Sequence, residues 1–254
     1  MPERLAATAM LCRTSDRWAA GAAGAAAVGD LLGARMVGSP GAPHDGRWND
    51  DLAAARGCLL EAGGQVDDAL DAGRIPLLLA GDCTVSIATL PVVARHRPDA
   101  WVLWIDAHPD FHTPSTTRSN FLGGMCLAGA CGLWETGHGP AFDPARVALL
   151  GVRDVDGPEE VLLATHGVGR PDTVAAVAGR PVFVHLDLDV LDPEVLPARF
   201  PAPGGLSFAD LEELLARIAD ECELVGAEVT SAHPDRAEAI TDALDALVES
   251  GSYA

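Results

Sequence analysis

The sequence predicts an α/β protein built on a mainly parallel β-sheet with helices covering both of its faces. Short apolar runs alternate along the chain with helical patterns of about 10 to 15 residues, which is typical of βαβ units. The 254 residues, 48% of them hydrophobic, can bury a large core. No linker, repeat or low-complexity segment divides the chain, so we expect a single domain over residues 1–254.

Short apolar runs are expected to form the strands. Residues 101–105 and 181–184 are apolar throughout, as in strands that are buried on both faces of a parallel sheet. The predicted strands cover residues 7–12, 34–37, 75–80, 101–105, 147–152, 182–186 and 224–229.

The segments between these strands are expected to form helices. Residues 47–72 are amphipathic with acidic side chains on one face, and residues 85–97 are mostly apolar. The segment from Ser207 to Asp210 resembles an N-terminal capping box, which predicts a helix from there to Cys222. Residues 234–249 are expected to form the closing helix.

The charge of the chain narrows the class of partner. The net charge is -20, and all 17 basic residues are arginine, without a single lysine. Nucleic acid and anionic membranes are therefore not expected as partners. A cationic or zwitterionic small molecule fits better, and formation of a homo-oligomer stays open.

The cysteines and the hydropathy of the chain bear on its location. Six cysteines, at positions 12, 58, 83, 126, 131 and 222, have no paired spacing that indicates a disulfide framework. There is no cationic, apolar N-terminal leader and no apolar run of about 18 residues. We therefore expect a cytoplasmic protein with reduced thiols.

Two acid-rich clusters follow predicted strands. Asp106, His108 and Asp110 come after residues 101–105, and Asp187 and Asp189 come after the strand that begins near residue 181. Ligands of open α/β sheets bind at the carboxyl ends of the strands, so both clusters can meet in one crevice. So many acidic oxygens would repel one another without a cation, and carboxylates with an imidazole suit Mn, Fe or Zn. The alternative is that these residues are solvated turn acids.

The chain resembles the arginase and agmatinase superfamily of ureohydrolases. The resemblance depends on DAHxD at residues 106–110, LDxDxLDP at 186–193, Gly204-Gly205-Leu206 and a glutamate, Glu228, on the last predicted strand. It implies a three-layer α/β/α sandwich with about eight mainly parallel strands. It also implies two Mn²⁺ ions that generate a hydroxide, which attacks a guanidinium carbon.

The resemblance assigns roles residue by residue. Asp106 and Asp187 match ligands that bridge both metals, and Asp110 matches a ligand of the first metal that also orients the hydroxide. His108 and Asp189 match ligands of the second metal. Glu228 matches the glutamate that binds the guanidinium, a planar cation that pairs well with a carboxylate.

One departure from the family concerns the first metal. The family motif GGDHS has a histidine ligand as its fourth residue, whereas this chain has Cys83 in that position. Thiolate is a soft donor and Mn prefers hard ones, so the first metal should bind more weakly or be softer than Mn. The alternative is that Cys83 is a buried apolar residue without a ligand role.

A second departure concerns proton transfer. Arginases have a histidine that is thought to carry protons to the leaving amine, and Gly123 takes its place here. His112 is the nearest replacement, although it falls where arginases have an asparagine that binds the substrate carboxylate, and it could equally be a solvated loop residue. His185 is expected to be a supporting or core residue rather than a ligand.

The resemblance extends to the substrate. Asp156 matches an aspartate that binds an α-ammonium, Glu159 follows three residues later, and Ser119 matches a serine near the α-carboxylate. Together with Cys83 and Gly123, these residues resemble the branch that hydrolyses Nω-hydroxy-L-arginine to L-ornithine and hydroxyurea in biosynthesis of the antibiotic D-cycloserine. Arginine, another guanidino acid or a formimino amide stays open as substrate. A degenerate, non-catalytic binding or regulatory protein is the alternative from another class.

Overall fold

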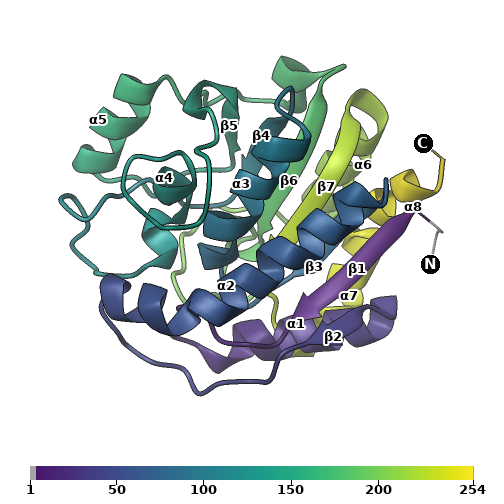
Figure 1. Cartoon of the computed structure of the whole chain (residues 1–254). Helices are drawn as coiled ribbons and strands as arrows, with labels where there is room; N and C mark the ends of the chain where they lie inside the picture. Colours follow the sequence, from purple (N-terminus) through teal and green to yellow (C-terminus); the bar gives the residue numbers. More distant parts are fainter. Residues whose placement is uncertain (1–3, 254) are drawn as a thin grey trace.

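The computed structural model describes residues 4–253 and has a parallel sheet between two layers of helices (Figure 1). This confirms the predicted α/β fold with three layers. Each predicted strand is present, with its ends shifted by no more than two residues. The strands are β1 (Leu5–Met10), β2 (Arg35–Val37), β3 (Ile75–Leu79), β4 (Trp101–Ile105), β5 (Val147–Leu150), β6 (Pro181–Asp187) and β7 (Glu223–Thr230).

The described residues form seven strands, which corrects the expected count of about eight. Beyond the edge strand β5, the chain makes only a single parallel bridge, between Ala148 and Gly169. Pro171 follows two residues later and has no amide hydrogen with which to extend the pairing. An eighth strand is therefore reduced to one bridge.

The helices divide into two layers. One layer contains α2, α3 and α4, and the other contains α1, α6, α7 and α8 (Figure 1). The helices are α1 (Ala19–Leu32), α2 (Trp48–Asp71), α3 (Ser86–His96), α4 (Cys126–Ala130), α5 (Gly157–His166), α6 (Phe208–Glu221), α7 (Ala237–Ala243) and α8 (Asp245–Tyr253).

Local sequence explains two of the helix boundaries. Helix α6 begins with the predicted capping box, in which Ser207 and Asp210 bond reciprocally. The closing helix is not continuous, contrary to the prediction. A 3-10 turn over Pro234–Arg236 precedes α7 and has its proline in the first turn, where the missing amide hydrogen costs no hydrogen bond. The buried Leu244 then separates α7 from α8.

The strand order is β2-β1-β3-β7-β6-β4-β5, and every pair is parallel. The last two strands in the chain therefore lie between β3 and β4. All carboxyl ends meet at one edge of the sheet, where loops from distant parts of the chain become neighbours. The register pairs His185 with Glu228 and Asp187 with Thr230, so the acidic cluster after β6 lies beside the end of β7.

Helix α1 packs backbone to backbone against two loops at this edge. A Cβ atom on Gly21 would lie 2.3 Å from the carbonyl oxygen of Gly81, in the loop after β3. A Cβ atom on Gly24 would lie 2.0 Å from the carbonyl oxygen of Ala232, after β7. Because a carbonyl oxygen cannot move aside as a flexible side chain can, only glycine fits at these positions.

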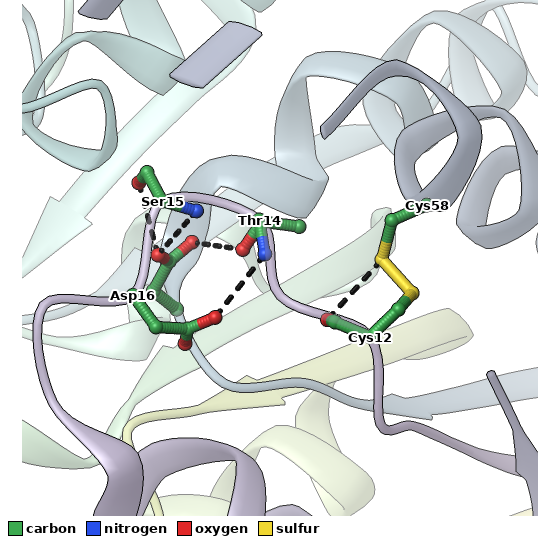
Figure 2. The surroundings of a disulfide bond; sticks show 6 residues. Cys12, Thr14, Ser15, Asp16 and Cys58 are labelled. Atoms are coloured by element: carbon green, nitrogen blue, oxygen red, sulfur yellow. Dashed lines mark hydrogen bonds between the residues drawn. A yellow bond between two sulfur atoms is a disulfide. The ribbon is translucent and has the colours of Figure 1, made fainter. Parts of the chain in front are cut away.

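A disulfide joins Cys12, just after β1, to Cys58 in α2 (Figure 2). The prediction of reduced thiols is therefore wrong for this pair, while Cys83, Cys126, Cys131 and Cys222 are free. The two partners are 46 residues apart in sequence, and only the packing of α2 beside β1 brings their Cα atoms to 5.9 Å. Within residues 4–253, no helix has both the length and the apolar character that a membrane crossing requires.

We expect four free thiols in the denatured protein without reductant and six after reduction, as a thiol titration would measure. Replacing Cys58 by serine should lower the free energy of unfolding by about 2 to 4 kcal/mol, because the bond restricts the unfolded chain. The same replacement at Cys222, which is free and half-buried, should have a smaller effect. Six titratable thiols before reduction would contradict the bond.

Candidate active site

The carboxyl-end edge of the sheet holds a cavity of about 470 Å³. Its walls come from the segments that follow β1, β3, β4, β5, β6 and β7. All the predicted metal-binding residues line it: Cys83, Asp106, His108, Asp110, Asp187 and Asp189. The structure thus brings together two clusters that are about 80 residues apart in sequence.

His108 connects two of the carboxylates. Its Nδ1 lies 3.0 Å from Asp189 Oδ2 and 3.4 Å from Asp106 Oδ1, and donor atoms of the three side chains lie within 4.8 Å of one another. Burial alone would lower the pKa of His108, but the two carboxylates raise it to about 12. Burial opposes ionisation of Asp189, yet the hydrogen bond with His108 leaves its pKa below the usual range. Without a metal, the imidazole carries the positive charge that these carboxylates require.

The positive charge of His108 does not compensate the other buried carboxylates in full, Asp106 included. Burial raises the pKa values of Asp106, Asp110 and Asp187, and repulsion from neighbouring carboxylates raises them further. Each of the three is at most 8% exposed, so water screens this repulsion poorly. A divalent cation would relieve it and could replace the proton on His108. The donor set of carboxylates and imidazole therefore fits a metal centre.

Cys83 belongs to the same cluster. Its thiol donates to Asp187 Oδ2 at 2.7 Å and lies 3.3 Å from the hydroxyl of Thr230. Burial, followed by the charge of Asp187, raises the pKa of the thiol. The contact with Asp187 places the sulfur among the predicted ligands rather than in a purely apolar core.

Two residues at the cavity have left-handed backbone conformations. Asp110 has φ 49° and Ser231 has φ 58°, a region that residues other than glycine rarely adopt. Such conformations are often found at functional sites. Ser231 donates to Asp187 Oδ2 at 2.7 Å, and the thiol of Cys126 donates to Asp110 Oδ2 at 3.5 Å. The backbone therefore holds both segments so that their side chains meet the acidic cluster.

Glu228 is not among the residues that line the cavity, and its expected contact with a guanidinium stays a prediction. It is fully buried within β7, where its carboxylate accepts hydrogen bonds from Ser86 and from Thr89 Oγ1 (2.6 Å), and lies 2.8 Å from Nδ1 of His185. Ser231, just past the end of β7, lines the cavity instead. Glu228 lies two residues before the end of β7, within the strand, whereas Ser231 follows the strand end.

The residues expected to bind the α-amino acid end line one side of the cavity. They are His112, Ser119, Asp156 and Glu159. His112 Nε2 lies 3.4 Å from Glu159 Oε2 and 3.7 Å from Asp156 Oδ2. Asp156 also caps α5 by accepting from the amide of Glu159 at 3.1 Å. Burial raises the pKa of Glu159 to about 7 and lowers that of His112, while Ser119 lies exposed at the rim.

Phe121 fills the space beside Gly123. A Cβ atom on Gly123 would lie 2.5 Å from the Phe121 ring, so a side chain there would displace the ring. Phe121 also contacts Phe200, with 4.9 Å between ring centroids, and the Arg17 guanidinium lies 4.9 Å from the Phe121 centroid. An aromatic wall therefore occupies the region where the resemblance places a proton-carrying histidine.

Several cavity residues were not predicted. Asp16, Arg17 and Trp18 come from the segment after β1, and Phe200 comes from the loop before α6. Burial, with repulsion from Asp82, raises the pKa of Asp16 to about 8. The signal for the first three was available, because the end of a predicted parallel strand lies at the same edge as the acidic clusters. Nothing in the local sequence places Phe200 there.

Comparison with known proteins agrees with this geometry. The arginase family model matches residues 44–249. The chain is 40% identical over 245 residues to an Nω-hydroxy-L-arginine amidinohydrolase from Streptomyces lavendulae, which covers 89% of each chain. It is 31% identical over 210 residues to an arginase from Bacillus caldovelox, covering 73% of this chain and 67% of that protein. The crystal structure of Entamoeba histolytica arginase with L-ornithine has a similar fold, with a TM-score of 0.81, 19% identity and coverage of 100% of this chain and 99% of that one.

We expect dialysed protein to retain clearly less than two equivalents of Mn²⁺, as elemental analysis would measure. Asp106, His108 and Asp189 offer a hard donor set, whereas Cys83 offers a soft sulfur to the neighbouring ion. Replacing Cys83 by histidine should raise the retained Mn²⁺, and replacing Cys131, which is buried away from the cavity, should not. Two tightly held Mn²⁺ ions in the unmodified protein would contradict the expectation.

Proposed function

Because this chain belongs to the arginase family, we propose that it hydrolyses the guanidino group of an arginine-like α-amino acid, with Nω-hydroxy-L-arginine as the favoured substrate. The products would be L-ornithine and hydroxyurea. Members of this family are hydrolases that act on amidine C–N bonds and carry a binuclear metal centre. The observation that carries the proposal is that one cavity contains both the acidic donor cluster and the group of His112, Asp156 and Glu159.

The acidic cluster would hold two divalent cations, of which at least one is Mn²⁺. Asp106 has donor atoms of Cys83 and of His108 within 4.8 Å, and Asp187 accepts hydrogen bonds from Cys83 and from the amide of Asp189, so both aspartates are suited to bridge the two ions. When bound, two such cations lower the pKa of a water molecule toward neutrality and so supply hydroxide. Asp110, which lines the cavity with one carboxylate oxygen 3.5 Å from Cys126, is placed to orient the attacking water.

The other end of the cavity would select an α-amino acid. Asp156 and Glu159 offer carboxylates to the α-ammonium, and His112 and the rim residue Ser119 offer hydrogen-bond donors to the α-carboxylate. Agmatine lacks the carboxylate and would leave the donors without partners. Discrimination of this kind is strong where a site is built to hydrogen-bond its substrate.

Two features favour the hydroxylated guanidine. First, the relative with 40% identity over 89% of this chain is named for that activity. Second, an aromatic wall and Gly123 occupy the region where a proton-carrying histidine is expected. A hydroxyguanidine is less basic than a guanidine, so more of it can react in its neutral form without such a histidine.

Ordinary arginase activity is the second candidate, supported by 31% identity to the B. caldovelox enzyme. A non-catalytic role is less well supported, because a binding protein has no chemical need for five clustered ligands with strongly perturbed ionisation. Parallel product assays with Nω-hydroxy-L-arginine, L-arginine and agmatine separate these candidates.

We expect Nω-hydroxy-L-arginine to be turned over faster than L-arginine. The kcat/KM for agmatine should be lower than that for the amino acids by up to about 10⁴-fold. Asp156→Ala should narrow the gap between the amino acids and agmatine by lowering kcat/KM for the amino acids. Asp172→Ala, an exposed aspartate outside the cavity, serves as the matched control. The proposal fails if agmatine is the best substrate, or if L-arginine equals the hydroxylated form from about pH 6 to 9.

The KM for the α-amino acid substrate should fall as the pH rises from about 6 to 8. The pKa of Glu159 is raised to about 7, so its carboxylate gains charge over this range and attracts the α-ammonium more strongly. Burial lowers the pKa of His112, which moves the titration of this imidazole toward or below the lower end of this range. Steady-state kinetics of the Glu159→Gln variant should show a higher KM without this pH dependence. An unchanged pH profile in that variant would assign the titration to another group.

A further inference from the structure

His185 has a free ring nitrogen in a fully buried position. The imidazole stacks on the Trp104 indole, with ring centroids 3.5 Å apart and an angle of 8° between the planes. Its Nδ1 lies 2.8 Å from Glu228 Oε1 and 3.2 Å from the hydroxyl of Ser86. Its Nε2 is buried and has no hydrogen-bond partner among residues 4–253.

Within the described part of the chain, the hydrogen-bond contacts of His185 involve only Nδ1, which lies beside Glu228 and Ser86. In the tautomer in which Nδ1 donates to Glu228, Nε2 has an unshared electron pair that can bind a metal. Histidines that bind metals usually donate their other ring N–H to a carboxylate or carbonyl, which fixes the tautomer and the orientation of the ring. Glu228 and the stacked Trp104 do this here. A core histidine without such a role would instead pair both of its nitrogens.

The position of His185 matches this chemistry. A ring nitrogen of His185, the sulfur of Cys83 and a carboxylate oxygen of Asp106 all lie within 4.8 Å of one another. Cys83 and Asp106 line the cavity, and His185 lies beneath them on β6. The three buried side chains offer one nitrogen, one sulfur and one oxygen to a single ion.

We propose that His185 is the nitrogen ligand of the metal ion held by Cys83 and Asp106, and that this site selects zinc, or a cation of similar softness, over manganese. Thiolate with imidazole and carboxylate is a donor set that zinc accepts and manganese disfavours. On binding, the Cys83 proton is released, because the thiolate is the form that ligates.

The consequence is a centre with two unlike sites. Asp106 belongs both to this set and to the oxygen-rich set with His108 and Asp189. A hard cation suits the second set, so the bridging aspartate would join a zinc-like ion to a manganese-like ion. This inference rests on the metal centre of the proposed function, but not on the choice of substrate.

The direct test is zinc X-ray absorption of unsubstituted protein loaded with one equivalent of Zn²⁺. We expect one sulfur at about 2.3 Å together with an imidazole on the same ion. The imidazole signal should be lost in His185→Gln and kept in His108→Gln. A zinc ion without sulfur, or an imidazole signal that persists in His185→Gln, would overturn the inference. The measurement on unsubstituted protein stands even if a variant fails to fold.

Metal competition gives a second readout. Glu228→Gln should weaken zinc binding about 10- to 100-fold by disturbing the orientation of His185. Cys83→Ser should abolish the preference for zinc over manganese, and Cys131→Ser is the matched control. Equal zinc affinity in Glu228→Gln and unsubstituted protein would contradict the proposal. If the protein bound zinc through sulfur and imidazole but did not hydrolyse Nω-hydroxy-L-arginine, the proposed substrate would be wrong and this inference would stand.

Discussion

Repulsion among the buried carboxylates Asp106, Asp110, Asp187 and Asp189 is the constraint on which the rest of the structure depends. Each is at most 8% exposed, so water cannot screen the charges and burial favours their protonated forms. Folding can gather these groups only if other interactions hold the strand ends in place. A bound cation relieves the repulsion that folding has built up, so the free energy spent in gathering the carboxylates strengthens metal binding.

Two residues, Trp104 and Arg153, help to hold the strand ends in place, because each contacts two other segments of the chain. Trp104 stacks on His185 and donates its indole N–H to Asp106 Oδ2 at 3.1 Å. Arg153, in the loop after β5, donates to the carbonyl oxygens of Asp189 and Val190, and also to Ala202. The guanidinium thus joins the loop that leads to Asp156 and Glu159 to the loop that carries Asp189. Because these bonds reach across separate elements, the acidic side chains cannot simply turn away from one another.

The sequence predicted those parts of the fold that depend on local pattern. Buried parallel strands are continuous apolar runs, so the strands could be predicted from the sequence. The acidic residues that follow two of these strands lie at the same edge of the sheet, so the cluster from Asp106 to Asp189 could be predicted as well. What could not be predicted depends on contacts between distant segments. The pairing of Cys12 with Cys58 requires α2 to pack beside β1, and the burial of Glu228 depends on contacts with Ser86 and Thr89 of α3 and with His185 of β6. The role that we propose for His185 likewise depends on neighbours on two other strands.

The disulfide has a practical consequence for any preparation of this protein. Thr14 and Ser15 lie two and three residues after Cys12 (Figure 2). Their hydroxyls donate to the two carboxylate oxygens of Asp82, the residue before Cys83. A reducing agent added to keep the Cys83 sulfur available to metal also cleaves the bond that anchors this segment, while an oxidising buffer spares the anchor and endangers the sulfur. Metal content and catalytic rate measured in different redox buffers would then describe different protein species, and comparing them requires that the thiol content of each sample be known.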